Sequence, residues 1–135
     1  MVGVPRLKPE LYEEGEEGAI WLSGGACECG HVFFPWQTFG CEVCGRHGAD
    51  LHPRRLSGSG SIVASATVHL HAGKGRQAPF DVCVVKLDDG PVIRTLLAGV
   101  GGPPQPGRAV RAVLVEVDGR GPGERVRDMR FEVAA

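Results

Sequence analysis

Four cysteines stand in two close pairs, and this spacing constrains the fold of the chain more than any other feature. The pairs are Cys27-Glu28-Cys29-Gly30 and Cys41-Glu42-Val43-Cys44-Gly45, with one residue between the first two cysteines and two between the second. Two cysteine pairs at such a separation are typical of a tetrahedral zinc site. Each pair ends in Cys-Gly, because glycine accepts the tight turn in which backbone N–H groups approach sulfur. The pattern predicts a zinc ribbon whose ligands are Cys27, Cys29, Cys41 and Cys44.

Two other interpretations of the cysteines stay open at this point, namely a pair of disulfides and unrelated buried thiols. The N-terminal sequence has no apolar core long enough for a signal peptide, and no apolar stretch approaches transmembrane length. We therefore expect a cytoplasmic chain without a membrane partner, and a reducing compartment favours metal ligation over disulfides. His31 and His47 lie near enough to replace a cysteine ligand. A shell of four sulfurs leaves no open position, which predicts a structural zinc and not a catalytic one.

Composition limits the rest of the chain. Its 135 residues have room for one modest domain and a small appendage. The formal charge of −1 gives no global field that attracts nucleic acid or an anionic membrane. Glycine, at 21 of 135 residues, exceeds the usual share of roughly 7%. This excess predicts short elements joined by many turns.

The sequence divides into three parts. Residues 1–20 form an N-terminal segment in which Pro9 and the acidic residues after it predict a short helix over 8–20. Residues 21–53 form the zinc ribbon. Residues 54–135 are rich in β-branched residues and turn signals, and they predict a separate β domain.

Five strands are expected in that domain, the first of them long and bent at Gly58 and Gly60. The expected strands are 56–70, 80–87, 92–97, 108–117 and a last one in which Met129, Phe131 and Val133 share a face. A turn at Asp88-Asp89-Gly90-Pro91 separates the second from the third. The pattern predicts a mainly β fold with a small Greek-key barrel of the OB type. An SH3-like barrel or an open sandwich fits the pattern almost as well.

Several of these segments resemble the DUF35 family. The stretches 22–35 and 40–45 are similar to its rubredoxin-type ribbon, and 56–60, 79–80 and 87–91 are similar to strands and a turn of its OB-fold half. The resemblance runs from about residue 8 to residue 132. Leu22-Ser23-Gly24-Gly25 places Cys27 where the first cysteine of the family falls.

The resemblance implies a function. It implies a non-catalytic accessory subunit that binds and stabilises a thiolase-superfamily enzyme, either a thiolase or a lipid-transfer-protein-type aldolase, acting on acyl-CoA or steroid-CoA thioesters. It also implies two copies of the chain on a dimeric enzyme, an α2β2 heterotetramer, and a contribution to the coenzyme A site.

A zinc-ribbon/OB module that binds nucleic acid is the main alternative. Such modules need a basic groove and aromatic stacking platforms. The barrel strands offer only Phe80 and Phe131, and their arginines alternate with acidic residues. The sequence therefore argues against nucleic acid as the partner.

The sequence predicts no catalytic residue. Cys83 lies in an apolar strand, where burial suppresses the reactive thiolate. His69 and His71 share one face of a strand, and they are expected to face solvent or an interface. Asp88 and Asp89 lie in a turn, where aspartate is common. This absence agrees with an accessory role.

Two groups of residues are candidates for binding. Lys74 and Arg76, in the loop between the first two strands, are candidates for contacting the phosphates of coenzyme A, against the interpretation of a solvated loop. The aromatic run is a candidate partner interface, although some of its members must pack the ribbon: Phe33, Phe34, Trp36 and Phe39. Residues 82–85 are apolar on both faces, so the outer face needs cover from the ribbon or from a partner.

Overall fold

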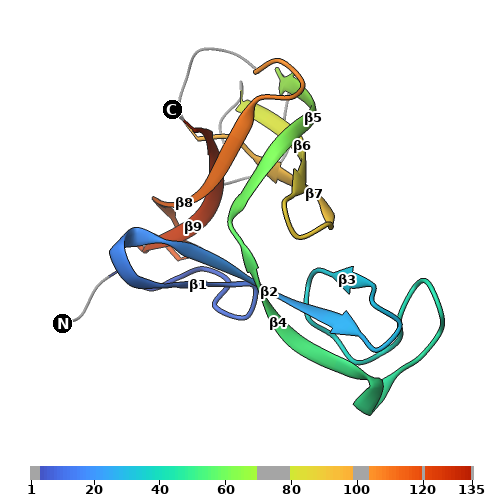
Figure 1. Cartoon of the computed structure of the whole chain (residues 1–135). Coiled ribbons are helices and arrows are strands. Elements are labelled where there is room, and N and C mark those ends of the chain that lie inside the picture. The colour runs from blue at the N-terminus through green and yellow to red at the C-terminus, as the bar shows by residue number, and fades with distance from the viewer. Residues whose placement is uncertain (1–3, 70–79, 99–103, 120, 135) are drawn as a thin grey trace.

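The computed structural model describes residues 4–69, 80–98, 104–119 and 121–134, and its strands form two antiparallel sheets (Figure 1). The first sheet contains β1 (Tyr12–Glu14), β2 (Ile20–Cys27), β3 (Val32–Phe33) and β4 (Leu51–Ser57). The second has the order β7-β6-β5-β8-β9, with β5 (Ser59–Val68), β6 (Phe80–Leu87), β7 (Val92–Leu96), β8 (Ala109–Asp118) and β9 (Arg125–Val133). The mainly β fold is confirmed.

The N-terminal segment is not the helix that we predicted over residues 8–20. Tyr12–Glu14 forms β1 and pairs with β2, and only Glu16–Gly18 turns, as a 3-10 helix. No α-helix occurs among the described residues. Tyr12 is 1% exposed, and its burial in the core outweighs the weak helix propensity of a stretch interrupted by Gly15 and Gly18. Gly15 also lies against Trp21, where an added Cβ would be 2.4 Å from Nε1.

The second sheet is the predicted barrel. Its strands match the expected segments closely, and β6 has the expected bounds. Leu97 forms a parallel bridge with Phe131, and the Ala98 N–H donates to the Phe131 carbonyl at 2.8 Å. This contact brings the end of β7 to β9, so the five strands curl into a partly open Greek-key barrel of the OB type.

The first predicted strand of the barrel is divided between the two sheets. β4 ends at Ser57 and pairs with β2, whereas β5 begins at Ser59 and pairs with β6. Gly58 lies between them, so near the other strands that a Cβ would be 2.6 Å from the Ile20 carbonyl oxygen. The chain thus passes from the ribbon sheet to the barrel through one residue, as the long green segment of Figure 1 shows. The division at residues 53 and 54 stays a prediction, and it falls within β4.

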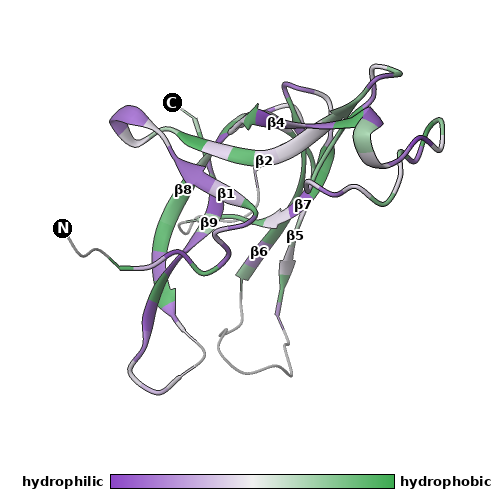
Figure 2. Ribbon diagram, turned by 90° about the horizontal axis from the view of Figure 1, so that it is seen from below, coloured by the Kyte–Doolittle hydropathy of each residue, from purple (hydrophilic) through white to green (hydrophobic). Residues whose placement is uncertain are grey.

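One core spans both sheets. It combines ribbon residues with barrel residues: Tyr12, Ile20, Leu22 and Leu56 with Ile62, Cys83, Val85, Leu87, Val110, Ala112 and Phe131. In β6, Cys83 and Val85 face this core, and Val82 and Val84 are half-buried on the other face. A smaller cluster of Cys27, Phe33, Cys41 and Leu51, with Trp36 against it, lies at the far end of the ribbon. Figure 2 shows the first sheet crossing one end of the barrel. None of the helices in the described segments has the length and hydropathy needed to span a bilayer.

Candidate metal centre and partner surface

The four predicted ligands converge at the far end of the ribbon. All four Sγ atoms lie within 4.8 Å of one another. Cys27 Sγ is 3.5 Å from Cys44 Sγ, and Cys29 Sγ is 3.7 Å from Cys41 Sγ. Four sulfurs placed tetrahedrally about 2.3 Å from a zinc ion would be roughly 3.8 Å apart, whereas a disulfide needs about 2.05 Å. All four cysteines are free thiols, so the disulfide interpretation is wrong and the donor set fits zinc.

The two cysteine pairs form matching turns of different length. In the first, Cys27 N donates to the His31 carbonyl at 2.8 Å, and Gly30 N donates to the Cys27 carbonyl at 2.8 Å. In the second, Cys41 N donates to the Arg46 carbonyl at 2.7 Å, and Gly45 N to the Cys41 carbonyl at 2.9 Å. Each bond of the second turn spans one residue more. The shorter Cys-x-Cys spacing therefore shortens the turn by one residue and keeps its geometry.

Glycine is required at the end of each turn. Gly30 has φ +100° and Gly45 has φ +82°, a left-handed conformation that L side chains rarely adopt. The conformation that we predicted for the two Cys-Gly steps is confirmed.

Backbone N–H groups lower the pKa of two of the four thiols, which favours the thiolate form that binds a metal. The Arg46 N–H lowers the pKa of Cys44 to about 6, and the Cys44 N–H lowers the pKa of Cys41. The Cys29 N–H also favours the Cys27 thiolate, but burial and the neighbouring sulfurs outweigh it and raise the pKa of Cys27 to about 12. Because thiolates are the ligand form, a bound cation would displace the remaining protons.

Neither histidine joins the four sulfurs in the described structure. His31 Nε2 lies 2.7 Å from Glu42 Oε1, so this pair links the first cysteine turn to the second. His47 precedes the 3-10 helix Gly48–Asp50. The geometry therefore favours four cysteine ligands over a set in which a histidine replaces one cysteine.

Two of the four aromatic residues in the predicted interface pack the ribbon. Phe33 is 6% exposed and stacks on Trp36, with ring centroids 6.1 Å apart and planes at 16°. Both rings lie on Gly25, where an added Cβ would be 2.5 Å from Phe33 and 2.6 Å from Trp36. Phe34 is half-buried and packs against the main core.

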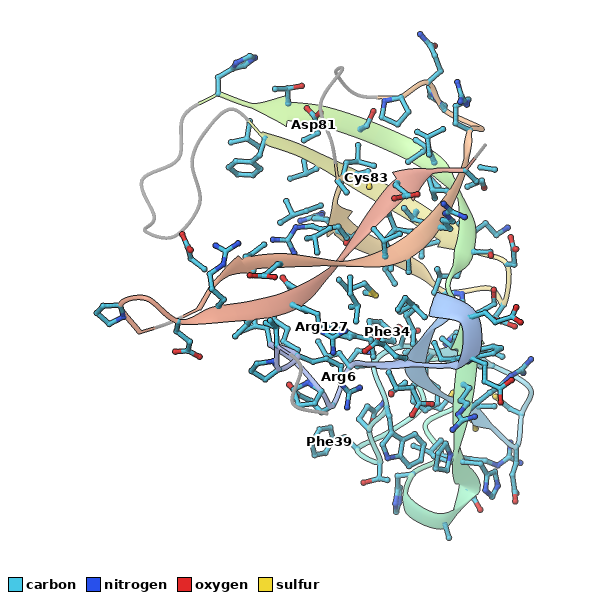
Figure 3. All side chains as sticks on the ribbon, turned by 90° about the vertical axis from the view of Figure 1, so that its left-hand side faces the viewer. Arg6, Phe34, Phe39, Asp81, Cys83 and Arg127 are labelled. Atoms are coloured by element: carbon cyan, nitrogen blue, oxygen red, sulfur yellow. The ribbon has the colours of Figure 1, made fainter. Side chains whose placement is uncertain are left out.

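Phe39 is different, because 91% of it is exposed, and it lies at the outer margin of the ribbon (Figure 3). Gln37 fixes the backbone around it. Gln37 Oε1 accepts from Phe39 N at 2.5 Å and from Gly40 N at 3.1 Å, and its side-chain amide donates to the Gly40 carbonyl at 2.8 Å. A rigid loop thus presents an unpacked aromatic ring.

Val43 is an exposed apolar residue that the sequence reasoning missed. It lies between Cys41 and Cys44 and is 67% exposed. The signal was present, because a side chain inside so tight a turn has no core to enter. Phe39 and Val43 flank Cys41 in the sequence, so the segment around this cysteine carries two exposed apolar side chains.

The other candidate residues do not form a common site. Cys83 is 1% exposed in the main core, and burial raises its pKa to about 11. His69 is exposed, and His71, Lys74 and Arg76 lie outside the described residues.

The turn aspartates and the barrel aromatics have structural positions. Asp89 Oδ2 accepts from Ser57 N at 2.6 Å and its Oδ1 is 3.6 Å from Arg54, so Asp89 ties the β6–β7 turn to β4. Asp88 is exposed beside it. Phe131 is completely buried and cannot stack on a base.

A buried polar network joins the N-terminal segment to β9, and no sequence signal indicated it. The Tyr12 hydroxyl donates to Asp128 Oδ1 at 3.0 Å, and Arg130 forms an ion pair with Asp128 Oδ2. Burial disfavours the Asp128 carboxylate, but Arg130 and the Tyr12 hydroxyl outweigh it and lower its pKa. Arg127 N also donates to the Pro5 carbonyl at 2.8 Å, and the Arg6 and Arg127 side chains lie on the same side of the molecule (Figure 3).

Comparisons with known proteins agree with this description. No family model matches the chain. Over 80 residues the chain is 31% identical to a DUF35 domain-containing scaffold protein of Pyrococcus furiosus, a match that covers 58% of this chain and 57% of that protein. The chain thus spans little more than half the length of this curated relative. It shares a fold with a chain of the solved Ltp2-ChsH2(DUF35) aldolase, at a TM-score of 0.65 and 22% identity over 85% of this chain and 86% of that one. Both of these proteins carry DUF35 in their names, and this chain is similar to the first in part of its sequence and to the second in its fold.

Proposed function

We propose that this protein is an accessory subunit that binds and stabilises a thiolase-superfamily enzyme acting on acyl-CoA or steroid-CoA thioesters. The names of the two similar proteins support this assignment, since one is a scaffold protein and the other belongs to an aldolase. The proposed assembly is two copies of this chain on a dimeric enzyme. The partner is either a thiolase or a lipid-transfer-protein-type aldolase.

The observation that carries the proposal is the exposed pair Phe39 and Val43. Aromatic residues are enriched at the energetic centres of protein interfaces. Ordering a flexible loop costs free energy on binding, and a loop fixed by Gln37 has already lost that freedom. The ribbon therefore offers a preorganised apolar anchor to a partner protein.

Zinc has a structural role in this proposal. Cys27, Cys29, Cys41 and Cys44 would hold the ion, which would neutralise the thiolates and fix both turns. Because Phe39 and Val43 lie on either side of Cys41, the metal would also set their relative position. Metal binding would thus couple the fold of the ribbon to binding of the partner.

Coenzyme A is the proposed ligand of the assembled complex, with Lys74 and Arg76 contacting its phosphates. Two cations on a loop suit a phosphate group electrostatically. This part of the proposal rests on residue type and position in the sequence.

Native mass spectrometry of the chain, affinity-purified from an extract of its own cells, tests the assignment. We expect a zinc-loaded complex containing two copies of this chain and two of an enzyme whose peptides identify it as a thiolase-superfamily member. A zinc-bound monomer that retains nucleic acid would overturn the proposal.

A pair of variants locates the interface. Phe39→Asp should reduce recovery of the enzyme by at least about tenfold, because it places a charge in a desolvated contact. Val63→Asp is the matched control, since Val63 is 49% exposed on β5, away from the ribbon. Equal recovery with both variants would show that Phe39 is not the anchor.

A further inference from the structure

Apart from the bridge between Leu97 and Phe131 just beyond its end, the outer edge of β7 is not paired with another strand among the described residues. Within the described residues β7 pairs along its length with β6 only. Leu87 N donates to the Pro91 carbonyl at 2.8 Å and Leu97 N to the Asp81 carbonyl at 3.0 Å, which fixes the hydrogen-bonding register. Alternate residues of an antiparallel strand face opposite edges. Val92 and Arg94 therefore direct their backbone N–H and C=O groups away from β6.

These outward groups have no partner within the described part of the chain. No backbone or side-chain hydrogen bond to the Val92 or Arg94 main chain is present there. A row of unpaired donors and acceptors is a template for another extended segment. The edge is consequently open to pairing.

Two cavities run along this edge, and Phe34 lines both. A cavity of about 640 Å³ lies at the Pro91–Val92 end, between β7 and the ribbon around β3. A cavity of about 230 Å³ lies at the Ile93–Leu96 end, between β7 and β9. Figure 1 shows β7 on the side of the barrel nearest β3. Together the cavities follow β7 from one end to the other.

The smaller cavity carries an excess of positive charge. Its charged lining residues are Lys8, Arg94, Arg130 and Asp128. Asp128 is paired with Arg130, whereas neither Lys8 nor Arg94 has an ion pair among the described residues. Leu11, Phe34, Ile93 and Met129 form an apolar wall beside them. This lining is complementary to a carboxylate side chain with an apolar neighbour.

We propose that the outer edge of β7 binds an extended acidic segment of the partner protein as an added strand. Main-chain hydrogen bonds to Val92 and Arg94 hold the segment, and a carboxylate enters the smaller cavity beside Lys8 and Arg94. In such strand addition the main chain supplies affinity and the side-chain pockets supply specificity. The inference rests on the proposed function for the identity of the partner, but the binding itself is a property of this chain.

Amide hydrogen exchange on the full-length chain tests the edge without the enzyme. The probes are the peptide acetyl-Thr-Glu-Val-Glu-Thr-amide, its Lys-for-Glu counterpart, and the acidic peptide with N-methylated backbone. We expect the acidic peptide to slow exchange at Val92 and Arg94 at least about tenfold. Ile93 and Thr95, already bonded to β6, should not change. Binding elsewhere, no binding at millimolar peptide, or equal protection by all three peptides would overturn the proposal.

A second copy of this chain is the other occupant that the test can reveal. In that case exchange at Arg94 would slow as the concentration of the chain alone is raised. Concentration-dependent protection of this kind would overturn the proposal of a foreign segment.

Variants at one position separate the backbone from the charge. Arg94→Pro removes an outward N–H together with the cation, a change that the backbone of a strand edge tolerates, whereas Arg94→Ala keeps the N–H and removes only the cation. Both should weaken binding of the acidic peptide, and only Arg94→Pro should weaken binding of a fourth probe, the same peptide with Gln in place of both Glu residues. Lys8→Glu is a further charge variant that leaves β7 intact. Unchanged acidic-peptide binding in Arg94→Ala and Lys8→Glu would contradict the charged subsite.

Failure of this inference is distinguishable from failure of the proposed function. If Phe39→Asp abolishes the enzyme complex and Arg94→Pro does not, the edge is not used and the accessory role stands. If no enzyme copurifies but the acidic peptide protects Val92 and Arg94, the edge binds a segment and the accessory role fails.

Discussion

The Tyr12 hydroxyl donates a hydrogen bond of 3.0 Å to Asp128 Oδ1, which joins the first strand of the ribbon sheet to the last strand of the barrel. Tyr12 is 1% exposed and Asp128 is 8% exposed. The two parts of the molecule are therefore joined by a buried polar contact as well as by a shared apolar core.

Removing either side chain of this contact should destabilise the protein, and the loss should be larger when an unpaired charge remains buried. Tyr12→Phe removes a hydroxyl that accepts from Lys8 N and lies within hydrogen-bond distance of Asp128 Oδ1 and the Arg127 carbonyl, and it should lower the free energy of unfolding by about 1–3 kcal/mol. Asp128→Ala leaves the Arg130 cation buried without its partner and should cost about 3–5 kcal/mol. Urea unfolding followed by tryptophan fluorescence measures both. A smaller loss for Asp128→Ala than for Tyr12→Phe would contradict the buried ion pair.

The same carboxylate predicts how stability depends on pH. The pKa of Asp128 is lowered in the folded state, so its carboxylate stabilises the protein above its unfolded pKa of about 3.9. That stabilisation should be lost as the pH falls below about 4, through the lower pKa of the folded state. Unfolding measured from pH 6 to pH 2 should show this loss in the wild type. In Asp128→Asn the decline should be shallower, and an unchanged pH profile would refute the assignment.

Zinc removal should unfold the far end of the ribbon before the barrel. The four ligands and the cluster of Phe33 and Leu51 lie together there, whereas the main core includes barrel residues that do not depend on the metal. We expect a chelator to shift the NMR signals of residues 27–51 to random-coil positions before those of the barrel. Cys29→Ser should have the same effect without chelator. Simultaneous loss of barrel and ribbon signals would show that the parts fold as one unit.

Gly25→Ala should destabilise the ribbon, because its Cβ would meet Phe33 and Trp36 at distances that neither aromatic ring can accept without moving. The expected loss is about 1–3 kcal/mol, typical of an overpacked site. Gly40→Ala is the matched control, since the nearest atom to its Cβ is the Arg46 carbonyl oxygen at 3.9 Å. Thermal unfolding of the two variants provides the comparison, and equal melting temperatures would contradict the close packing at Gly25.

The loop cations predict a separate effect on ligand binding. The double variant Lys74→Ala/Arg76→Ala should weaken acyl-CoA affinity of the assembled complex by about tenfold, if each cation contributes a charge-assisted contact. Isothermal titration of the complex measures this. Arg55→Ala is a control on the ribbon sheet, where Arg55 is paired with Glu13 at 2.5 Å. Unchanged affinity in the double variant would remove these residues from the coenzyme A site.

Local features of the fold could be predicted from the order of the residues. The spacing of Cys27, Cys29, Cys41 and Cys44 predicted that the four sulfurs would lie together, and glycine after each pair predicted the turn conformation found at Gly30 and Gly45. Alternating β-branched residues and the Asp88-Asp89-Gly90 turn predicted the barrel strands to within a few residues. These features depend on residues that are close together in the sequence, so they can be predicted without knowing the tertiary contacts.

Contacts between distant segments were decided by the tertiary structure. Tyr12 forms a strand because it pairs with Leu22 and is buried near Asp128, which outweighs the local tendency of acidic residues to begin a helix. The strand expected across Gly58 divides there because its two halves pair with β2 and with β6. The aromatic run contains both a buried residue, Phe33, and an exposed one, Phe39. Phe33 is buried because the folded ribbon brings Gly25 against its ring. Burial is a property of the packed molecule, and for this reason the sequence named the candidate residues but could not separate core from surface.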